Sequence, residues 1–233
     1  MRTKRTAELV LGVALFLSCS VTPALAQVAG VQGGVGVPLG TFAAPPHEEP
    51  VAEGAQTGFW VQVLYLYPVG SVYFRSAATF TSFGEEEKAF TSVGTVAGFR
   101  HDVLSFVAGI EADPFSREVV RPFAHGGPGI YAYSGRAIDM GRLRPGERIA
   151  PDEFQFKWQV RFGVEVGGGV IIQLVPELVQ ARVAVSYTTV FTGSLKGFVG
   201  YQAGAQLFEY PYPYRGKRFE YLLVGVGVVV QPQ

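Results

Sequence analysis

The sequence predicts an all-β fold, a closed antiparallel up-and-down transmembrane β-barrel of about eight strands. Segments of about ten residues alternate between apolar and polar side chains with a period of two. The connections between these segments are alternately short and long, as in outer-membrane barrels. The chain is also apolar and poor in charge, with 48% hydrophobic and 16% charged residues, against roughly 25% charged residues in soluble domains. Together these observations favour strands that face hydrocarbon.

The first 26 residues have the pattern of a secretory signal peptide. Arg2, Lys4 and Arg5 form a positive beginning, an apolar run covers 9–17, and Ala24-Leu25-Ala26 offers the small residues that signal peptidase prefers. The apolar run is shorter than the roughly 20 residues that a membrane-spanning helix needs. We therefore expect cleavage after Ala26 and export to the outer membrane.

Two other interpretations of this segment are an uncleaved anchor and a lipoprotein cut before Cys19. Leu17 argues against the lipoprotein, because a small residue is usual at its position. We expect 1–26 to be the signal peptide and 27–233 the barrel domain. Removal of 1–26 leaves a net charge near −2 and no cysteine, hence no disulfide framework. Near-neutral charge also disfavours nucleic acid as a partner, since phosphate binding needs a concentrated basic surface.

The alternation is clear in the first half of the mature chain. Phe59, Val61 and Val63 share one face of a strand, opposite Trp60 and Gln62. The same period predicts strands at 29–39, 59–67, 72–80, 103–113 and about 121–134.

The second half has the strongest alternation. In the sixth predicted strand Val160, Phe162 and Val164 alternate with Arg161 and Glu165. A seventh strand is predicted at about 180–191 and a last one at 218–230, which is apolar on both faces except for Arg218 and Glu220.

The connections predict closure of the sheet. Short turns are expected near 68–70, 114–120 and 175–178, and long polar loops at 41–56, 83–102, 135–153 and 192–217. Because hydrocarbon cannot hydrogen-bond an edge strand, the sheet must close on itself. With both termini in the periplasm the strand number is even. The segments 89–99 and 197–210 alternate weakly, and counting both as strands gives ten.

Periodicity alone does not say which face is inside, so a soluble periplasmic lipocalin-like barrel is the alternative fold. Two features favour the membrane barrel. The polar face mixes glycine and small residues with a few charges, which suits a narrow lumen. The apolar face carries large aromatic residues near strand ends, where membrane girdles lie: Phe59, Tyr67, Phe80, Trp158, Tyr187 and Phe191.

Three segments, 33–40, 121–131 and 181–187, resemble the small outer-membrane β-barrel proteins of the OmpA-type transmembrane-domain class. The resemblance covers essentially the whole mature chain and implies a structural, adhesive or protective role, or less often a narrow pore. It also implies outer-membrane lipid and the outer-membrane assembly machinery as partners. Members often end on an aromatic residue, whereas this sequence ends Gln231-Pro232-Gln233, and the peptidoglycan-binding domain of some relatives is not found.

Charged residues on the polar face are the candidate functional residues. An eight-stranded barrel is only wide enough for its own side chains, and a buried charge needs a partner because its desolvation costs several kcal/mol. The first interpretation is a network of ion pairs that fills the lumen. The second is a narrow pore whose charges tune selectivity. The candidates are Arg75, Glu111, Lys157, Arg161, Glu165 and Arg182, with Glu220 as a further one.

An enzymatic function is not expected, and neither is a cofactor or a metal. His47, His101 and His125 are accompanied by no nucleophile motif, metal-spaced histidine pair or carboxylate dyad. The Gly126–Gly129 segment resembles a phosphate-binding loop, but it has no lysine and falls in a predicted strand. We interpret it as a site of close side-chain packing.

The last long loop is strongly aromatic. Its rings are interpreted as part of the outer headgroup interface, with an extended hairpin above the membrane or a surface for a partner as the alternatives: Phe198, Tyr201, Phe208, Tyr210, Tyr212 and Tyr214. The sequence thus predicts a non-enzymatic outer-membrane barrel with a filled lumen and a structural or surface-interaction role. A narrow pore for small solutes and a soluble binding barrel are the alternatives.

Overall fold

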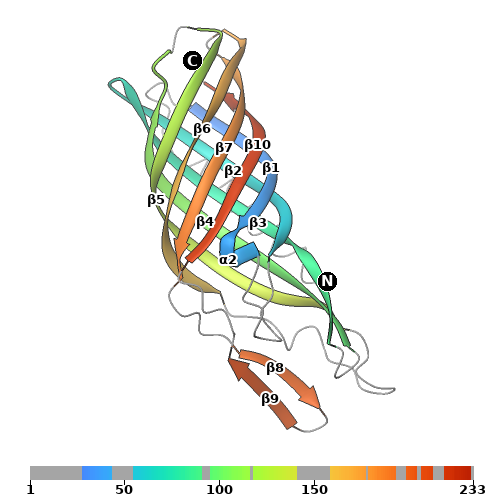
Figure 1. Ribbon diagram of the computed structural model, residues 1–233. Coiled ribbons are helices and arrows are strands. Elements are labelled where there is room, and N and C mark those ends of the chain that lie inside the picture. The colour runs from blue at the N-terminus through green and yellow to red at the C-terminus, as the bar shows by residue number, and fades with distance from the viewer. Residues whose placement is uncertain are drawn as a thin grey trace.

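The computed structural model describes residues 28–43, 55–90, 95–115, 118–140, 158–176, 178–192, 198–203, 206–211 and 218–231, with the backbone alone at 41, 85–90, 95–99, 135–140, 198–203 and 206–211. Eight strands form a closed antiparallel barrel in the order β1-β10-β7-β6-β5-β4-β3-β2 (Figure 1). This confirms the predicted up-and-down barrel of eight strands.

The barrel strands differ considerably in length. They are β1 (Val28–Leu39), β2 (Gln56–Val69), β3 (Val72–Phe90), β4 (Thr95–Ala112), β5 (Val120–Met140), β6 (Gln159–Val175), β7 (Val179–Phe191) and β10 (Arg218–Val230). A four-residue helix, α2 (Gly40–Ala43), follows β1. A separate two-stranded sheet, β8 (Phe198–Ala203) with β9 (Gln206–Pro211), lies in the connection from β7 to β10.

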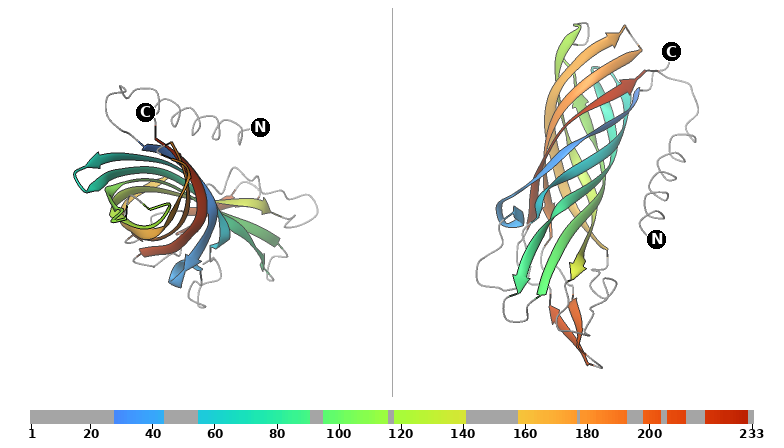
Figure 2. Two further views of the ribbon diagram at one scale, coloured as in Figure 1. Left: turned by 90° about the horizontal axis from the view of Figure 1, so that it is seen from above. Right: turned by 90° about the vertical axis from the view of Figure 1, so that its right-hand side faces the viewer.

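The barrel has a short-turn end and a long-loop end. Three brief connections, from β2 to β3, from β4 to β5 and from β6 to β7, join strands at the short-turn end, at the top of Figure 1. The long-loop end carries α2 and the extended tips of β3, β4 and β5, as Figure 2 shows from the side. In outer-membrane barrels the short turns are periplasmic and the longer loops extracellular.

The register sets the width of the barrel. Following paired residues once around the barrel from Val28 leads back to β1 at Pro38, ten residues further along the chain. With eight strands at normal spacing, this stagger corresponds to a strand tilt of about 40°, and the interior is only wide enough for side chains.

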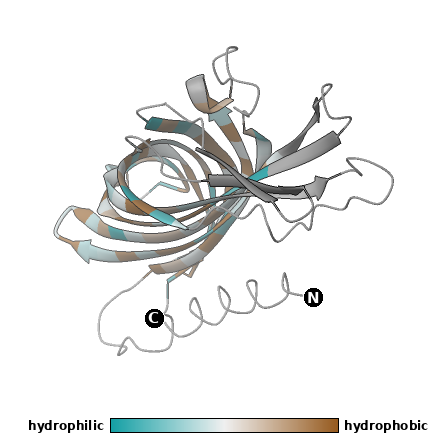
Figure 3. Cartoon of the chain, turned by 90° about the horizontal axis from the view of Figure 1, so that it is seen from below, coloured by the Kyte–Doolittle hydropathy of each residue, from teal (hydrophilic) through white to brown (hydrophobic). Residues whose placement is uncertain are grey.

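The strands present their polar and small side chains to the lumen and their apolar ones outward, as predicted. Trp60, Gln62 and Leu64 of β2 are buried, whereas Phe59, just before them, and Val61, between them, are half exposed. Figure 3 shows the resulting bands, which alternate between hydrophobic and hydrophilic along the barrel strands. An apolar side chain that is exposed on a closed barrel must face either water or lipid.

The size of the exposed apolar surface decides between water and lipid. Large apolar residues stand outward on every barrel strand, among them Val35, Phe106, Ile130, Phe162, Val185 and Val226. Soluble monomers rarely expose a continuous apolar surface of more than a few hundred Å². The exterior therefore excludes the soluble lipocalin-like alternative and matches the lipid-facing band of a membrane barrel. No helix among the described residues is long and apolar enough to cross a membrane.

Several predicted loops contain regular structure instead. In the predicted loop 83–102, β3 continues to Phe90 and β4 begins at Thr95, paired beyond a register shift after Phe83. Likewise β5 runs on to Met140. These sequences are polar because the hairpins continue beyond the apolar band of the barrel. Both faces of a strand in water can be polar, so apolar and polar residues need not alternate there. In the region of 197–210, β8 and β9 pair with each other outside the barrel, so the ten-strand count was wrong for the barrel itself.

The outward placement of β7 predicts a depth-dependent effect of added charge. Val185 is the central residue of β7 and is 44% exposed, whereas Val160 is the second residue of β6, at the long-loop end. Val185→Arg should lower the free energy of unfolding by about 2–4 kcal/mol, and Val160→Arg by about 0–1 kcal/mol. Urea unfolding in lipid vesicles measures both. Equal losses, or none for Val185→Arg, would show that β7 does not face the bilayer as described.

Candidate functional site: a buried ion-pair network in the lumen

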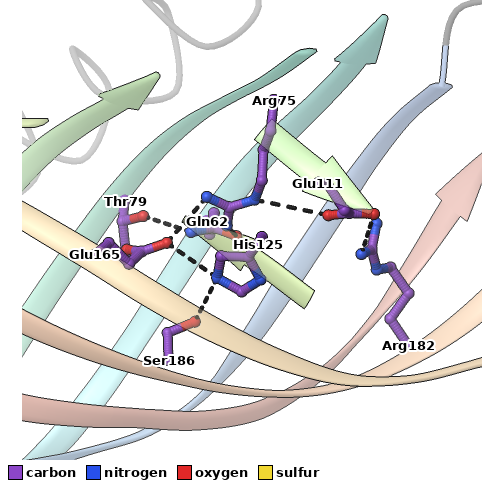
Figure 4. A network of polar contacts seen from close by, with 8 residues as sticks. All are labelled: Gln62, Arg75, Thr79, Glu111, His125, Glu165, Arg182 and Ser186. Atoms are coloured by element: carbon purple, nitrogen blue, oxygen red, sulfur yellow. Dashed lines mark hydrogen bonds and ion pairs between the residues drawn. The ribbon is translucent and has the colours of Figure 1, made fainter. Parts of the chain in front are cut away.

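Four of the six candidate charges meet inside the barrel (Figure 4). Arg75 (β3), Glu111 (β4), Glu165 (β6) and Arg182 (β7) all have side chains no more than 4% exposed. They come from four strands because each occupies a lumen-facing position of its own strand.

Arg75 joins the two carboxylates. Its Nη1 lies 2.9 Å from Oε1 of Glu165, and its Nε lies 3.8 Å from Oε2 of Glu111. The other oxygen of Glu111 lies 2.6 Å from Nη2 of Arg182, whose guanidinium carbon is 4.1 Å from the centre of the Phe123 ring. The four residues form a continuous chain of ion pairs with two positive and two negative charges. This balance offsets the desolvation cost that each ion would carry alone.

Neutral polar groups extend the network to neighbouring strands. Nη2 of Arg75 donates to Oε1 of Gln62 at 3.2 Å, and Nε2 of Gln62 donates to Oγ1 of Thr79 at 2.8 Å. On the other side, Nε2 of His125 lies 3.4 Å from Oε1 of Glu165 and 3.1 Å from Oγ of Ser186. The network therefore links six strands, from β2 to β7.

Glycines clear the space in which these side chains meet. Gly109 is paired with Arg75, and Gly127 is paired with Glu165. A Cβ on either glycine would collide with the backbone of the other's strand. The strands β4 and β5 therefore approach closely here, and no side chain stands in the row between the arginine and the glutamate.

Gly167 has the same function for the histidine. It is paired with His125, and a Cβ added to it would lie 2.8 Å from Nε2 of His125. Because that position bears no side chain, the imidazole can lie across β6 and reach Ser186 on β7. The glycines of the Gly126–Gly129 segment and of β6 thus allow close packing in the lumen, as interpreted from the sequence.

The remaining candidates do not join the network. Arg161 donates from Nε to the backbone oxygen of Thr192 at 3.0 Å and from Nη2 to Oε1 of Gln159 at 2.9 Å, because it lies four residues nearer the long-loop end than Glu165. Glu220 was predicted wrongly: it lies on the outer face, where it accepts a hydrogen bond from Tyr187 at 2.7 Å and pairs with Arg218. Lys157 lies outside the described residues.

Some buried polar atoms of the network have no hydrogen-bond partner among the described residues. They are Nε and Nη1 of Arg182, Oε2 of Glu111 and Nδ1 of His125. Cation–π contact with Phe123 covers part of the Arg182 guanidinium. Within the network, these are the atoms whose hydrogen-bonding capacity is not met.

The long-loop end of the lumen is closed by aromatic rings. We call this set the aromatic layer: Phe42, Phe83, His101, Tyr133, Phe219 and Tyr221, each no more than 2% exposed. Phe42 lies 4.6 Å from Phe219 and 5.0 Å from Phe83 between ring centres. The lumen thus has a charged middle section and an apolar closure toward the extracellular side.

The histidine, glutamate and serine of the network are not arranged for acyl transfer. A Ser–His–acid relay places the serine on one imidazole nitrogen and the acid on the other. Here Ser186 and Glu165 both contact Nε2 of His125. Within the described ranges there is also no group of three or more metal-ligating side chains.

Sequence reasoning missed Gln62 and His125 as members of the network, and the pair of Asp113 with Arg121 near the short-turn end. Gln62 was correctly assigned to the polar face but was not considered as a partner for a charge. His125 shares its parity with Phe123 and Tyr131 on β5, so assigning faces to that strand would have placed it in the lumen.

The contacts of Glu165 predict which double variants are non-additive. Glu165→Ala should cost about 3–5 kcal/mol, since it leaves Arg75 without its closest carboxylate. Adding Arg75→Ala should cost less than the sum of the two single changes, because the Arg182–Glu111 pair stays balanced. Adding Arg161→Ala should be additive to within about 0.5 kcal/mol. Double-mutant cycles of urea unfolding test this, and coupling to Arg161 instead of Arg75 would contradict the described contacts.

No protein-family model matches the sequence, and no curated protein is significantly similar to it. Solved structures share its fold. The outer membrane protein OprG from Pseudomonas aeruginosa is 11% identical with a TM-score of 0.52, over 90% of this chain and 97% of that chain. A major outer membrane protein from Thermus thermophilus is 12% identical with a TM-score of 0.50, over 88% of this chain and 99% of that one. The shared feature is the small outer-membrane β-barrel, which is broader than the OmpA-type class, and the apolar exterior fits the same location.

Proposed function

We propose that this chain is a non-enzymatic outer-membrane protein whose lumen does not conduct and whose role is structural or depends on surface interactions. The observation that carries the proposal is the filled lumen. Arg75 and Glu165 reach each other across the barrel interior, and the aromatic layer lies between them and the long-loop end. A solute would have to break buried ion pairs and displace packed rings.

We propose a non-enzymatic role because of the geometry of His125, Glu165 and Ser186. The imidazole of His125 contacts an acid and a serine through one nitrogen only, so no acid on the opposite nitrogen orients it as a base for the serine. The outer-membrane lipid is the expected partner of the exterior. The outer-membrane assembly machinery is the expected partner during insertion.

A narrow pore is the second candidate, and one observation favours it. The atoms of Arg182, Glu111 and His125 that have no hydrogen-bond partner among the described residues need hydration, because an unsatisfied buried polar group costs about 1–3 kcal/mol. Water at these atoms would give the middle of the lumen a hydrated section.

Recording from planar bilayers distinguishes the two candidates. We expect the purified protein to produce no reproducible single-channel steps. The pore predicts steps whose ion selectivity changes in Arg182→Gln, which alters the network, and changes less in Arg218→Gln, on the outer face. Reproducible steps with this difference in selectivity would contradict the closed barrel and support the pore.

A further inference from the structure

The aromatic layer is built as a cage around one ring. The Phe42 ring meets Phe83 edge-on, with ring centres 5.0 Å apart and planes at 85°. It lies 4.6 Å from Phe219 and 5.7 Å from the imidazole of His101. Edge-to-face and tilted contacts at these distances are the arrangements that aromatic rings prefer. The Phe42 ring is thus enclosed by other rings on several sides.

The cage and its occupant come from different parts of the fold. Phe83, His101 and Phe219 stand on the barrel strands β3, β4 and β10. Phe42 belongs to α2, a helix of four residues that follows β1 through Gly40, whose φ is +54°. The walls of the cage are therefore fixed by the barrel, whereas its occupant is held by a short loop element.

Phe42 does not satisfy the cage completely. Nδ1 of His101 lies 2.6 Å from the hydroxyl of Tyr133. The opposite nitrogen, Nε2, is buried and has no hydrogen-bond partner among the described residues, and the whole side chain is 2% exposed. An apolar ring beside it leaves this nitrogen unpaired, which is unfavourable for a buried polar group.

We propose that the cage is a binding site for a small molecule with one aromatic ring and a hydroxyl group, of which phenol is the simplest. The ring takes the place of Phe42, and the hydroxyl pairs with Nε2 of His101. A hydroxyl can donate or accept, so it suits Nε2 whether the hydrogen shared with Tyr133 belongs to the imidazole or to the phenol group of the tyrosine. Binding releases α2 from the barrel.

The wild-type barrel tests the release of α2. The signal segment holds the one cysteine of the sequence, Cys19, so Ala43→Cys can be modified selectively in the exported protein. Phenol should raise the rate at which a membrane-impermeant thiol reagent modifies Cys at 43 several-fold, and benzene should raise it less. Ser71→Cys, in the exposed turn between β2 and β3, is the control for general loosening. An unchanged rate at position 43 in saturating phenol would overturn the proposal.

The role of the imidazole is tested in Phe42→Ala, which empties the cage. Titration of its His101 resonances in lipid nanodiscs should give about tenfold tighter binding of phenol than of benzene, the ratio expected for one added hydrogen bond. His101→Phe in the same background should abolish the preference. Equal affinities for the two ligands would overturn the proposal. Heat-modifiable gel migration verifies folding, and if Phe42→Ala does not fold, the modification rate at position 43 decides alone.

Discussion

The rest of the structure depends on one physical constraint, the need of a buried charge for an opposite charge, which the ion pair between Arg75 and Glu165 illustrates. Eight strands with a stagger of ten residues enclose an interior with no room for bulk water around a charge. A charge buried in the middle of the lumen must therefore find an opposite charge. Arg75, Glu111, Glu165 and Arg182 satisfy this requirement in one continuous chain of contacts, and breaking one link leaves an ion buried without compensation.

The same constraint explains where several glycines and aromatic residues lie on the strands. Position 167 is a glycine, and the imidazole of His125 occupies the space that a side chain at this position would need. Gly109 and Gly127 leave the row between Arg75 and Glu165 free of side chains, and β4 and β5 approach closely there. Nearer the long-loop end, the aromatic layer fills the described lumen in place of the ion pairs. On the outside, hydrocarbon disfavours polar and charged side chains, and the exposed faces of the strands are apolar.

The sequence predicted the parity of the strands because a closed barrel enforces a strict period of two between two different solvents. It therefore placed Arg75, Glu111, Glu165 and Arg182 on the lumen face correctly. It did not identify their partners, since the register between strands depends on closure of the whole sheet. Arg161 shares the parity of Glu165 but lies too near the long-loop end. Glu220 was misplaced because β10 is apolar on both faces, so its own alternation does not indicate which face is inside. The pairing of β3 and β4 beyond Phe83 was missed because that region lacks the alternation that a lipid interface imposes.

The most direct test of the closed lumen is the accessibility of a cysteine at Thr188. This residue faces the lumen with no measurable exposure and is paired with Glu165 on one side and Tyr221 on the other, between the ion pairs and the aromatic layer. In folded Thr188→Cys, a small charged thiol reagent supplied from both sides of the membrane should leave the cysteine unmodified, and urea unfolding should make it react. Modification of the folded barrel at the rate found for Ser71→Cys would contradict a filled lumen.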